Sequence, residues 1–548
     1  MMYREISKFL AKYCATFALI ICIPLWVAFY YEFLAPPEFH PQPHATWAFV
    51  LTSAVVLACG YGFYHFGKKA KGLIYRREGL ILVVAIWLLT PLLAMLPFLF
   101  SGTLKNPVQA FFETVSGLTT TGSTIMQAKL YDGDGNEIPI IGRIKDSQTT
   151  TYRFWGTVEP VRDAGGEIVY QGVEAVGKAI LFWRSFIQWI GGVGVLVLLI
   201  AVLPALGVGG KVLFQAESPG PIKETLTPRL GETAAYLWKI YLSLTCVQVF
   251  LLMLCDVKIS FFDAICISFS TVSTGGFAVK NSSIGAYDNF GVYWIVILFM
   301  IIGSVNFSLY FYILRGKFLR LKDPELIAYL ASLFFSGCFT AYWLWGTPKI
   351  LLGPDRGGHF SWWEAITHGF FQTVSAQSSS GFATANYDLW PFAVQALLLI
   401  VMFLGGMSGS TAGGIKIMRF VILFRLIQHR IELLFRPTTV RISRVGKMAI
   451  SSDAAQTVLS FFVVFIGATV LGVFLLVIDG VDPETALSVV ASSINNVGIT
   501  FREAGPTLSC AFLTTFGCLV SCFLMILGRL ELFALLVILM PAFWKQRI

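Results

Sequence analysis

The sequence has little charge for its length. Only 13% of its 548 residues are Asp, Glu, Lys or Arg, whereas 56% are hydrophobic, and soluble domains carry nearer to a quarter charged residues. Windows of roughly 20 apolar residues, enough to cross a ~30 Å hydrocarbon core, recur along nearly the whole chain. The gaps between them are shorter than an ordinary soluble domain of ~100 residues. The composition therefore predicts an integral membrane protein.

The sequence also lacks the motifs of metal sites and of intramembrane enzymes. The ten cysteines form no CxxC pair and no Cys/His grouping at zinc spacing, so we expect them to be small buried hydrophobes. HExxH, GxSxG and paired Asp or His on one helix are also missing, which argues against an intramembrane enzyme. The net charge is +9, and the basic residues cluster in particular loops without aromatic residues interleaved among them. We therefore expect no nucleic-acid partner.

Hydropathy predicts ten spanning helices. They lie near residues 8–30, 45–65, 79–101, 180–204, 235–255, 291–313, 325–345, 392–425, 455–478 and 508–543. The first stretch is too long for the apolar region of a signal peptide and lacks an A-x-A-like site, so we expect a retained helix. Basic residues gather on alternate connections, at 68–77, 315–322 and 416–447. The positive-inside rule then places these connections and both termini in the cytoplasm.

A short pattern occurs four times, each time between two spanning helices. Its copies are Ser116–Gly122, Ser270–Gly276, Ser375–Gly381 and Ser492–Gly498. A small residue stands twelve positions before each glycine: Ala110, Ala264, Gly369 and Ala486. The interval between them suits a short helix that enters the membrane and returns as a loop. A unit with two full crossings brings the chain back to its starting side, so the four units are parallel repeats that can surround one axis.

The predicted fold is an all-α membrane protein with four pseudo-symmetric helix, pore-loop, helix repeats around one central pore. Two additional transmembrane helices occupy residues 1–70. The repeats span 71–210, 211–322, 323–450 and 451–548, and the first contains a polar insertion at about 127–177. We expect the insertion to be a small extracellular cap with a β-hairpin. Its Asp132–Glu137 segment resembles the start of a calcium loop, but its sixth residue is Glu rather than the required Gly, so calcium is not expected.

The loop residues suit a weakly hydrated monovalent cation. Glycine tolerates positive φ, so the backbone can aim successive carbonyl groups at the axis, and rings of carbonyl oxygens replace the hydration shell of potassium. No carboxylate lies between the Ser and the Gly of any copy, which argues against a divalent cation. Potassium is the expected transported ion.

Each unit also has glycine in its second helix, at Gly191, Gly303, Gly405 and Gly528, and the third unit extends this to a Gly/Ser/Thr run ending at Lys416. The apolar helix before that run is too short to cross a bilayer, so we expect a helix break inside the membrane that obstructs or opens the path. A flexible cytoplasmic linker is the alternative.

Arg529 lies in the last apolar stretch and is a functional candidate, either as an electrostatic barrier or as a residue that docks on the break. The alternative is an arginine that snorkels from a helix end.

These segments resemble the TrkH branch of the Trk/Ktr/HKT potassium transporter superfamily. The resemblance is carried by 119–123, 270–277, 182–192, 405–416 and 528–531. It implies filter residues in the four loops, and the expected ion-contacting set is Thr120, Thr121, Gly122, Ser123, Thr274, Gly275, Gly276, Phe277, Ser379, Ser380, Gly381, Phe382, Asn496, Val497, Gly498 and Ile499. It also implies a gate, for which the expected residues are Gly405, Gly406, Ser408, Gly409, Ser410, Thr411, Gly413, Gly414, Lys416 and Arg529.

The resemblance further implies a homodimer in a bacterial inner membrane and a cytoplasmic TrkA-like subunit that binds nucleotide. Relatives that prefer sodium have Ser at the first filter glycine, whereas this chain has Gly122, which favours potassium. Two features depart from the family pattern: the third loop has Ser379-Ser380 where relatives often have Thr, and the insertion is long.

A secondary transporter that couples potassium or another solute to sodium or protons is the main alternative. Such a protein would need ionisable residues or broken helices in paired halves near the midplane. Fourfold loops with few buried carboxylates favour the channel-like interpretation.

Overall fold

The structure is a computed structural model. It describes residues 2–35, 44–70, 76–144, 150–163, 165–194, 230–354, 357–436, 444–445 and 448–545. The end of the predicted helix at 180–204 and the predicted boundary residues 71, 210 and 211 lie outside this set.

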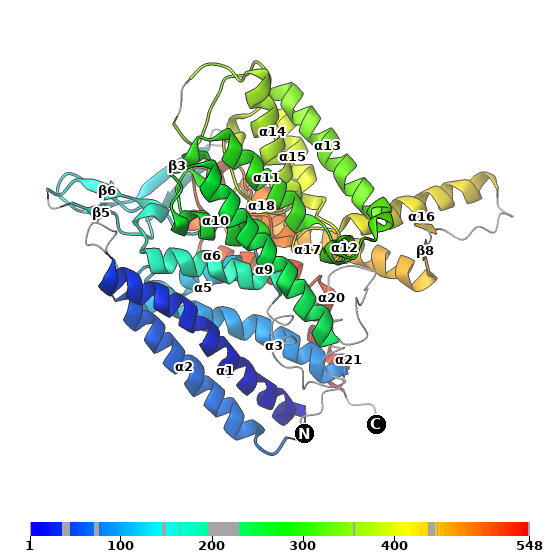
Figure 1. Cartoon of the computed structure of the whole chain (residues 1–548), viewed down its shortest axis with the longest axis horizontal. Helices are drawn as coiled ribbons and strands as arrows, with labels where there is room; N and C mark the ends of the chain where they lie inside the picture. Colours follow the sequence, from blue (N-terminus) through cyan, green and yellow to red (C-terminus); the bar gives the residue numbers. More distant parts are fainter. Residues whose placement is uncertain are drawn as a thin grey trace.

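Helices make up most of the described chain (Figure 1). The helices that lie in the predicted spans are α1 (Met2–Phe29), α2 (Ala45–Gly67), α3 (Arg76–Ala94), α6 (Lys178–Val193), α9 (Leu230–Cys255), α11 (Phe290–Ser304), α13 (Pro324–Leu344), α15 (Phe392–Phe403), α16 (Ile417–Phe435), α17 (Ser452–Ile478) and α19 (Thr515–Arg529). Four short helices of 12 to 16 residues lead into the Ser-to-Gly loops: α5 (Pro107–Leu118), α10 (Phe261–Val272), α14 (Trp362–Gln377) and α18 (Pro483–Asn495). The remaining pieces are α4 (Leu96–Phe100), α12 (Phe307–Leu314), α20 (Phe533–Leu539), α21 (Pro541–Trp544) and single turns such as η6 (Arg502–Ala504) and η7 (Cys510–Phe512).

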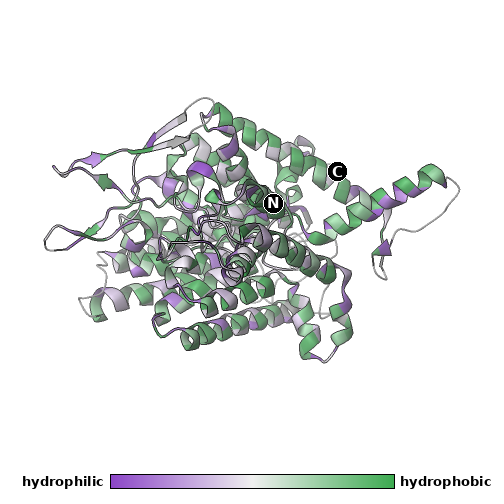
Figure 2. Cartoon of the chain, turned by 90° about the horizontal axis from the view of Figure 1, so that it is seen from above, coloured by the Kyte–Doolittle hydropathy of each residue, from purple (hydrophilic) through white to green (hydrophobic). Residues whose placement is uncertain are grey.

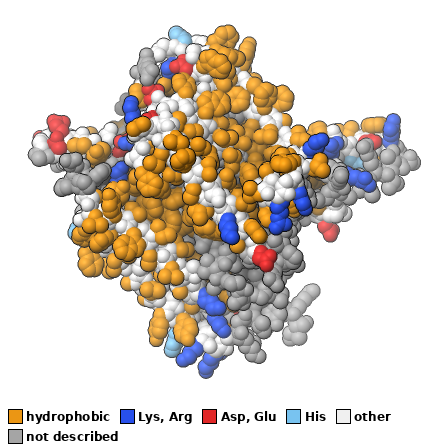
Figure 3. Space-filling view, in the orientation of Figure 1, with side chains coloured by type: hydrophobic (Ala, Val, Ile, Leu, Met, Phe, Trp, Pro, Cys, Tyr) orange, Lys and Arg blue, Asp and Glu red, His pale blue; other side chains and the backbone are white. Residues whose placement is uncertain are grey.

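Length and composition mark the chain as a multi-pass membrane protein. Among the described residues, six helices are long and apolar enough to cross a membrane, and the number is eight if each of two bent pairs is one span. Hydrophobic side chains cover the middle of the face in Figure 3, while most of the charged side chains lie towards its margins. In Figure 2, hydrophobic residues likewise run along most of the helices.

Among the described residues, three of the predicted spans are interrupted by a sharp bend or a non-helical run. The stretch 291–313 turns by 95° between α11 and α12, and 508–543 turns by 116° between α19 and α20. The stretch 392–425 is interrupted between α15 and α16, as the glycine-rich run predicted. In the first two cases the hydropathy averaged over the whole stretch is high, so the average gave no sign of the turn. Asn306 caps α12 by accepting a hydrogen bond from the Ser308 amide, and Glu531 and Leu532 adopt positive φ.

The insertion contains β-structure, as expected, but as three hairpins rather than one. The antiparallel pairs are β1 (Leu130–Tyr131) with β2 (Glu137–Ile138), β3 (Ile140–Ile144) with β4 (Thr150–Phe154), and β5 (Val161–Arg162) with β6 (Ile168–Tyr170). The calcium-like segment forms the turn of the first hairpin, where Asp132 Oδ1 accepts hydrogen bonds from the amides of Asp134 (3.1 Å) and Asn136 (2.8 Å). A further pair, β7 (Arg444–Val445) and β8 (Met448–Ala449), follows α16.

Ion pairs hold the first hairpin to the rest of the insertion. The Lys129 ammonium lies 3.0 Å from Glu137 and 2.8 Å from Glu159. Partial burial opposes ionisation of Glu159, but the Lys129 and Tyr131 hydrogen bonds outweigh it and lower the pKa of this carboxyl. The same contacts raise the pKa of Lys129, so the pair stays charged at neutral pH.

Polar caps begin all four short helices. Asn106, Ser260, Ser361 and Asp482 accept hydrogen bonds from amides of the first turn, which satisfies donors that have no partner within the helix. Pro107 and Pro483 occupy the first helical position, where the missing amide costs nothing.

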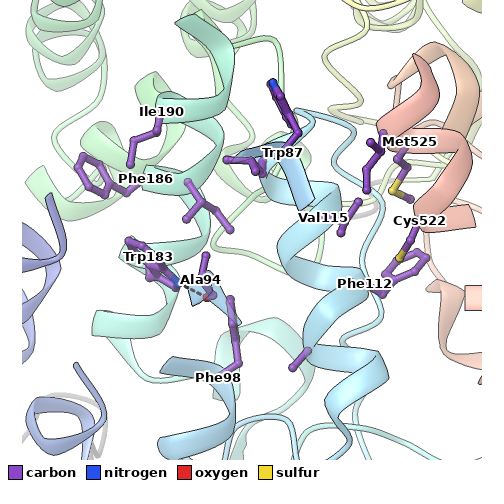
Figure 4. Packing of buried hydrophobic residues seen from close by; sticks show 14 of the residues in the cluster. Trp87, Ala94, Phe98, Phe112, Val115, Trp183, Phe186, Ile190, Cys522 and Met525 are labelled. Atoms are coloured by element: carbon purple, nitrogen blue, oxygen red, sulfur yellow. Dashed lines mark hydrogen bonds between the residues drawn. The ribbon is translucent and has the colours of Figure 1, made fainter. Parts of the chain in front are cut away.

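Small residues let these helices pack closely against their neighbours. Ala110, Ala264 and Ala486 are fully buried, and a Cβ on Gly369 would lie 3.1 Å from the amide nitrogen of Ala341 on α13. Figure 4 shows α5 between α6 and α19, with Phe112 and Val115 of α5 directed towards Cys522 and Met525. The Trp183 indole donates to the Ala94 carbonyl at 3.0 Å. The first short helix thus packs between α6 and α19, and α6 is in turn bonded to α3.

Candidate functional site

The four Ser-to-Gly loops share one backbone conformation. We call them loops 1 to 4 (residues 119–123, 273–277, 378–382 and 495–499). In each loop the glycine and the residue two positions before it have positive φ. The values are 56° and 83° for Thr120 and Gly122, 55° and 82° for Thr274 and Gly276, 55° and 77° for Ser379 and Gly381, and 52° and 84° for Asn496 and Gly498. Non-glycine residues rarely adopt positive φ, and strain of this kind clusters at functional sites.

The serine six residues before the glycine fastens the loop to its helix. Ser116 Oγ donates to the Ser123 carbonyl at 2.5 Å, and Ser375 Oγ donates to the Phe382 carbonyl at 2.7 Å. In loop 4 the direction is reversed, because Ser492 Oγ accepts from the Gly498 amide at 2.9 Å. Ser270 Oγ, in the second copy, has no hydrogen-bond partner among the described residues. In the first and third copies the serine is thus placed to bridge the turn with one hydroxyl bond.

The loops follow one another in a closed cycle. A Cβ on Gly122 would collide with the carbonyl oxygen of Gly275, one on Gly276 with that of Ser380, one on Gly381 with that of Val497, and one on Gly498 with that of Thr121. At all four junctions the oxygen belongs to the residue before the next loop's glycine. The same atoms thus meet four times around one centre, and no side chain fits between them.

Side chains brace the cycle from outside. Gln188 of α6 donates to the Gly275 carbonyl at 2.6 Å and accepts from the Phe277 amide at 3.0 Å. Asn496 donates to Thr121 Oγ1 at 3.0 Å and to the Met525 carbonyl at 2.9 Å. The second bond ties loop 4 to α19, and the first joins the last loop of the chain to the first.

A buried ion pair lies at the exit of loops 1 and 2. Glu113 and Arg184 have almost no exposed side-chain surface, and Arg184 Nε donates to Glu113 Oε1 at 2.7 Å. Glu113 also accepts from the Ile125 amide at 2.9 Å. Arg184 donates to the Ala278 carbonyl at 3.1 Å and stacks on Phe277. The pair therefore connects the chain after loop 1 with the chain after loop 2.

The glycine-rich break (residues 404–416) lies against loops 2, 3 and 4. Thr411 Oγ1 is 3.3 Å from Thr274 Oγ1 in loop 2, and the Gly413 amide donates to Ser379 Oγ in loop 3 at 2.6 Å. A Cβ on Gly413 would collide with the carbonyl oxygen of Asn495 in loop 4. Gly409 and Gly414 have φ of 75° and 70°. Contact with loop 1 is made through Arg529.

Arg529 joins three parts of the site. Its guanidinium donates to Thr120 Oγ1 of loop 1 (3.1 Å), to the Thr411 carbonyl of the break (2.8 Å) and to the Gly191 carbonyl of α6 (2.6 Å). Of the two sequence interpretations, docking onto the break agrees with these contacts. The snorkelling interpretation does not, since the side chain reaches inward to backbone carbonyls.

Four polar side chains of the break are buried, whereas Gly409 is exposed. Ser408, Ser410, Thr411 and Lys416 are less than 9% exposed. The Lys416 ammonium donates to the Ala412 carbonyl. A Cβ on Gly406 would lie 2.9 Å from the Ser304 carbonyl, and one on Gly405 would collide with the Gly413 carbonyl. The alternative of a flexible cytoplasmic linker is therefore wrong, because this segment is packed inside the protein.

Glycines in the second helices permit close approach to the loops. Cβ atoms on Gly191 and Gly528 would collide with the carbonyls of Leu118 and Ile494, and one on Gly303 would lie 3.0 Å from that of Val272. These carbonyls belong to equivalent positions at the ends of α5, α18 and α10. Glycine at these positions thus lets the second helix of a unit pack directly against the end of its short helix.

The structure brings all the candidate loop and break residues together, but it also gathers residues that the sequence did not single out. Glu113 stood among apolar residues at membrane depth, a signal that could have found it. Gln188 and Glu325 carried no such signal. Glu325, at the start of α13, accepts hydrogen bonds from the Ser408 and Met418 amides.

The sequence matches the family model for the TrkH cation transport protein over residues 157–335 and 359–546. The chain belongs to the TrkH family. Among curated relatives, the Trk system potassium uptake protein TrkH of Vibrio parahaemolyticus is 32% identical and that of Escherichia coli K12 is 31% identical, each aligned over 100% of both chains. The crystal structure of the potassium transporter TrkH from Vibrio parahaemolyticus superimposes with a TM-score of 0.78 at 30% identity and covers 100% of both chains. The resemblance inferred from the motifs is thus confirmed.

Proposed function

We propose that this chain takes up potassium across a bacterial inner membrane through a filter made of loops 1 to 4. The observation that carries the proposal is the closed cycle, in which each loop glycine lies against the carbonyl oxygen before the next loop's glycine. The names of the relatives, Trk system potassium uptake proteins, support potassium as the ion.

The proposed filter acts through backbone oxygens. Positive φ at alternate residues turns successive carbonyls to one side of the strand instead of to opposite sides. Rings of such dipoles can replace the hydration shell of potassium. The hydroxyls of Thr120 and Ser379 are engaged by Arg529 and by the Gly413 amide, so carbonyls rather than these hydroxyls are proposed as ligands.

The glycine-rich break is the proposed gate. Its contacts with loops 2, 3 and 4 and the Arg529 bond to Thr411 support a plug that lies below the filter and is held by removable hydrogen bonds. A homodimer, a cytoplasmic TrkA-like nucleotide-binding subunit and cytoplasmic termini belong to the same proposal. The Trk system names of the relatives support the partner, and the basic connections support the orientation.

A coupled secondary transporter is the second candidate. The observation in its favour is the set of buried ionisable side chains Glu113, Arg184, Glu325 and Lys416, because such groups inside a membrane often serve ion pathways. Each of them has protein partners, which favours a structural role. Potassium flux into proteoliposomes, measured with and without a sodium or proton gradient, separates the candidates. A channel-like protein needs neither gradient.

The filter proposal predicts that Gly381→Ser lowers the permeability ratio of potassium to sodium. A side chain at this position meets the Val497 carbonyl, and the backbone φ is 77°, so the carbonyls of two loops must shift. The ratio is measured from tracer uptake of each ion by proteoliposomes. Gly467→Ser is the matched control, since a Cβ there has no atom within 4 Å. An unaltered ratio for Gly381→Ser would mean that loop 3 is not part of a filter.

The gate proposal predicts that deletion of residues 408–413 raises potassium flux in the absence of a nucleotide-binding subunit. The deletion removes Thr411 and Gly413, which hold the break against loops 2 and 3, and leaves the loops themselves intact. Flux and permeability ratio are measured together. A higher flux with an unchanged ratio supports the gate, and an unchanged flux counts against it.

A further inference from the structure

One carboxyl oxygen of Glu325 accepts several hydrogen bonds from the glycine-rich break and the helix that follows it. Its Oε1 accepts hydrogen bonds from the Ser408 amide (2.7 Å), from Ser408 Oγ (3.0 Å) and from the Met418 amide (3.2 Å). The side chain is buried, with 3% exposed. A single carboxylate oxygen thus binds both ends of the segment that lies below the loops.

The chemistry of these bonds favours a charged acceptor. Met418 lies in the first turn of α16, where backbone amides have no partner inside the helix and the helix dipole is positive. Hydrogen bonds to an ionised acceptor are roughly twice as strong as neutral ones. The Glu325 carboxyl therefore supplies a hydrogen-bond acceptor that this buried helix start lacks.

The position of these bonds limits the movement of the break. Ser408 and Met418 flank residues 409–417, which include the Thr411 and Gly413 contacts to loops 2 and 3. Arg529, from the fourth unit, holds the middle of this segment at the Thr411 carbonyl, whereas Glu325 holds its ends from the third unit. The segment cannot leave the loops as a body unless the Glu325 bonds break.

We propose that Glu325 is a positioning residue that stabilises the closed arrangement of the break. The inference rests on the proposed gate and deepens it: the Glu325 carboxylate sets how often the gate opens but does not touch the permeating ion. Loss of the carboxylate frees Ser408 and Met418, which flank residues 409–417, and shifts the gate towards its open state, while the loops keep their conformation.

The chain offers a matched control, because Asp-Pro-Glu occurs at the start of two helices. In both, the aspartate caps the helix and accepts a hydrogen bond from the glutamate amide. Glu325 turns to the break, whereas Glu484 turns to Arg502 and is 55% exposed. The same substitution in the same local sequence therefore tests the tertiary contact alone.

The experiment compares Glu325→Gln, Glu325→Ala, Ser408→Ala and Glu484→Gln in proteoliposomes without a nucleotide-binding subunit. Glu325→Ala should raise potassium flux by on the order of tenfold, the effect of losing a charged hydrogen bond. Glu325→Gln retains an acceptor oxygen and Ser408→Ala removes one bond, so both should give smaller increases. The permeability ratio of potassium to sodium and the flux of Glu484→Gln should not change.

The inference is overturned if Glu325→Gln, Glu325→Ala and Ser408→Ala all show wild-type potassium flux. It is also overturned if the flux rises while the permeability ratio of potassium to sodium falls. If Glu325→Ala does not give folded protein by size-exclusion chromatography, Glu325→Gln and Ser408→Ala decide the question. The deletion of residues 408–413 separates the two proposals. If the deletion raises potassium flux but the Glu325 variants keep wild-type flux, only the role of Glu325 is rejected. If the deletion itself leaves potassium flux unchanged, the gate is rejected.

Discussion

At the scale of single residues, serine hydroxyl groups stabilise two of the loops through hydrogen bonds to backbone carbonyls. Ser116 and Ser375 each bond a carbonyl on the far side of a turn, at 2.5 and 2.7 Å. Such bonds matter because Thr120 and Ser379 hold positive φ, which the surrounding structure must maintain against its conformational cost. The serines are therefore parts of the loops although they are not proposed to bind the ion.

Ser375→Ala should lower the permeability ratio of potassium to sodium more than Ser270→Ala does. The first substitution removes the bond to the Phe382 carbonyl, worth about 1 kcal/mol, whereas Ser270 Oγ has no hydrogen-bond partner to lose in the part of the chain that the structure describes. Tracer uptake of both ions by proteoliposomes measures the ratio. Equal losses in the two variants would contradict the role given to the hydroxyl.

At the scale of elements, the insertion joins units that are far apart in sequence. Hairpin β3–β4 belongs to the first unit, yet Tyr152 donates to Asp482 Oδ2 and accepts from the Asp482 amide, both at 2.7 Å. Asp482 is the residue that caps α18. At its other end, Asn281, beyond loop 2, accepts from the Val173 amide at 2.9 Å. The insertion thus contacts the second and fourth units and helps to orient the short helix before loop 4.

Tyr152→Phe should speed hydrogen exchange in β3, β4 and the first turn of α18. The substitution leaves Asp482 Oδ2 without its donor, at a cost of about 1–3 kcal/mol, while the Phe512 ring contact, 5.3 Å between centroids, is retained. Hydrogen exchange with mass spectrometry provides the measurement. Tyr61→Phe is the control, because that ring is 71% exposed on α2. Unchanged exchange in α18 would show that the insertion does not support it.

At the scale of the whole molecule, the last unit closes the cycle onto the first. Asn496 and Thr121 are 375 positions apart in the sequence and bond at 3.0 Å, and a Cβ on Gly498 would collide with the Thr121 carbonyl. One polypeptide therefore makes the contact that separate subunits make in an oligomeric ring. The elongated α16 projects from this body (Figure 1).

Asn496→Ala and Thr121→Val should lower the permeability ratio by less in combination than the sum of their separate effects. The two residues share one hydrogen bond, and residues in contact couple by about 0.5–3 kcal/mol. Thr121→Val combined with Ser375→Ala is the control pair, since no bond joins Thr121 to Ser375 among the contacts described here. Additive effects for the first pair would contradict a closed contact between loops 4 and 1.

Much of the fold and the site could be predicted because both repeat. Hydropathy located the membrane helices, and the Ser-to-Gly spacing located the four loops, since each copy carries the same turn. The two bends at 305–306 and 530–532 were missed because the hydropathy averaged over each stretch stays high although Asn306 and Glu531 lie at the bends. Burial inside a membrane hides a helix end from hydropathy, which measures affinity for lipid and not backbone direction.

The sequence by itself determined that the chain resides in a membrane, that it contains four equivalent turns and that the third unit is interrupted by glycines. These features follow from local composition and spacing. Only the tertiary structure decided which of two identical Asp-Pro-Glu helix starts supports the break, since Glu325 and Glu484 differ in what lies opposite them and not in their neighbours along the chain. It also decided that Arg529 reaches Thr120 and Thr411. Contacts across more than 80 residues depend on how helices pack, and no local pattern records that packing.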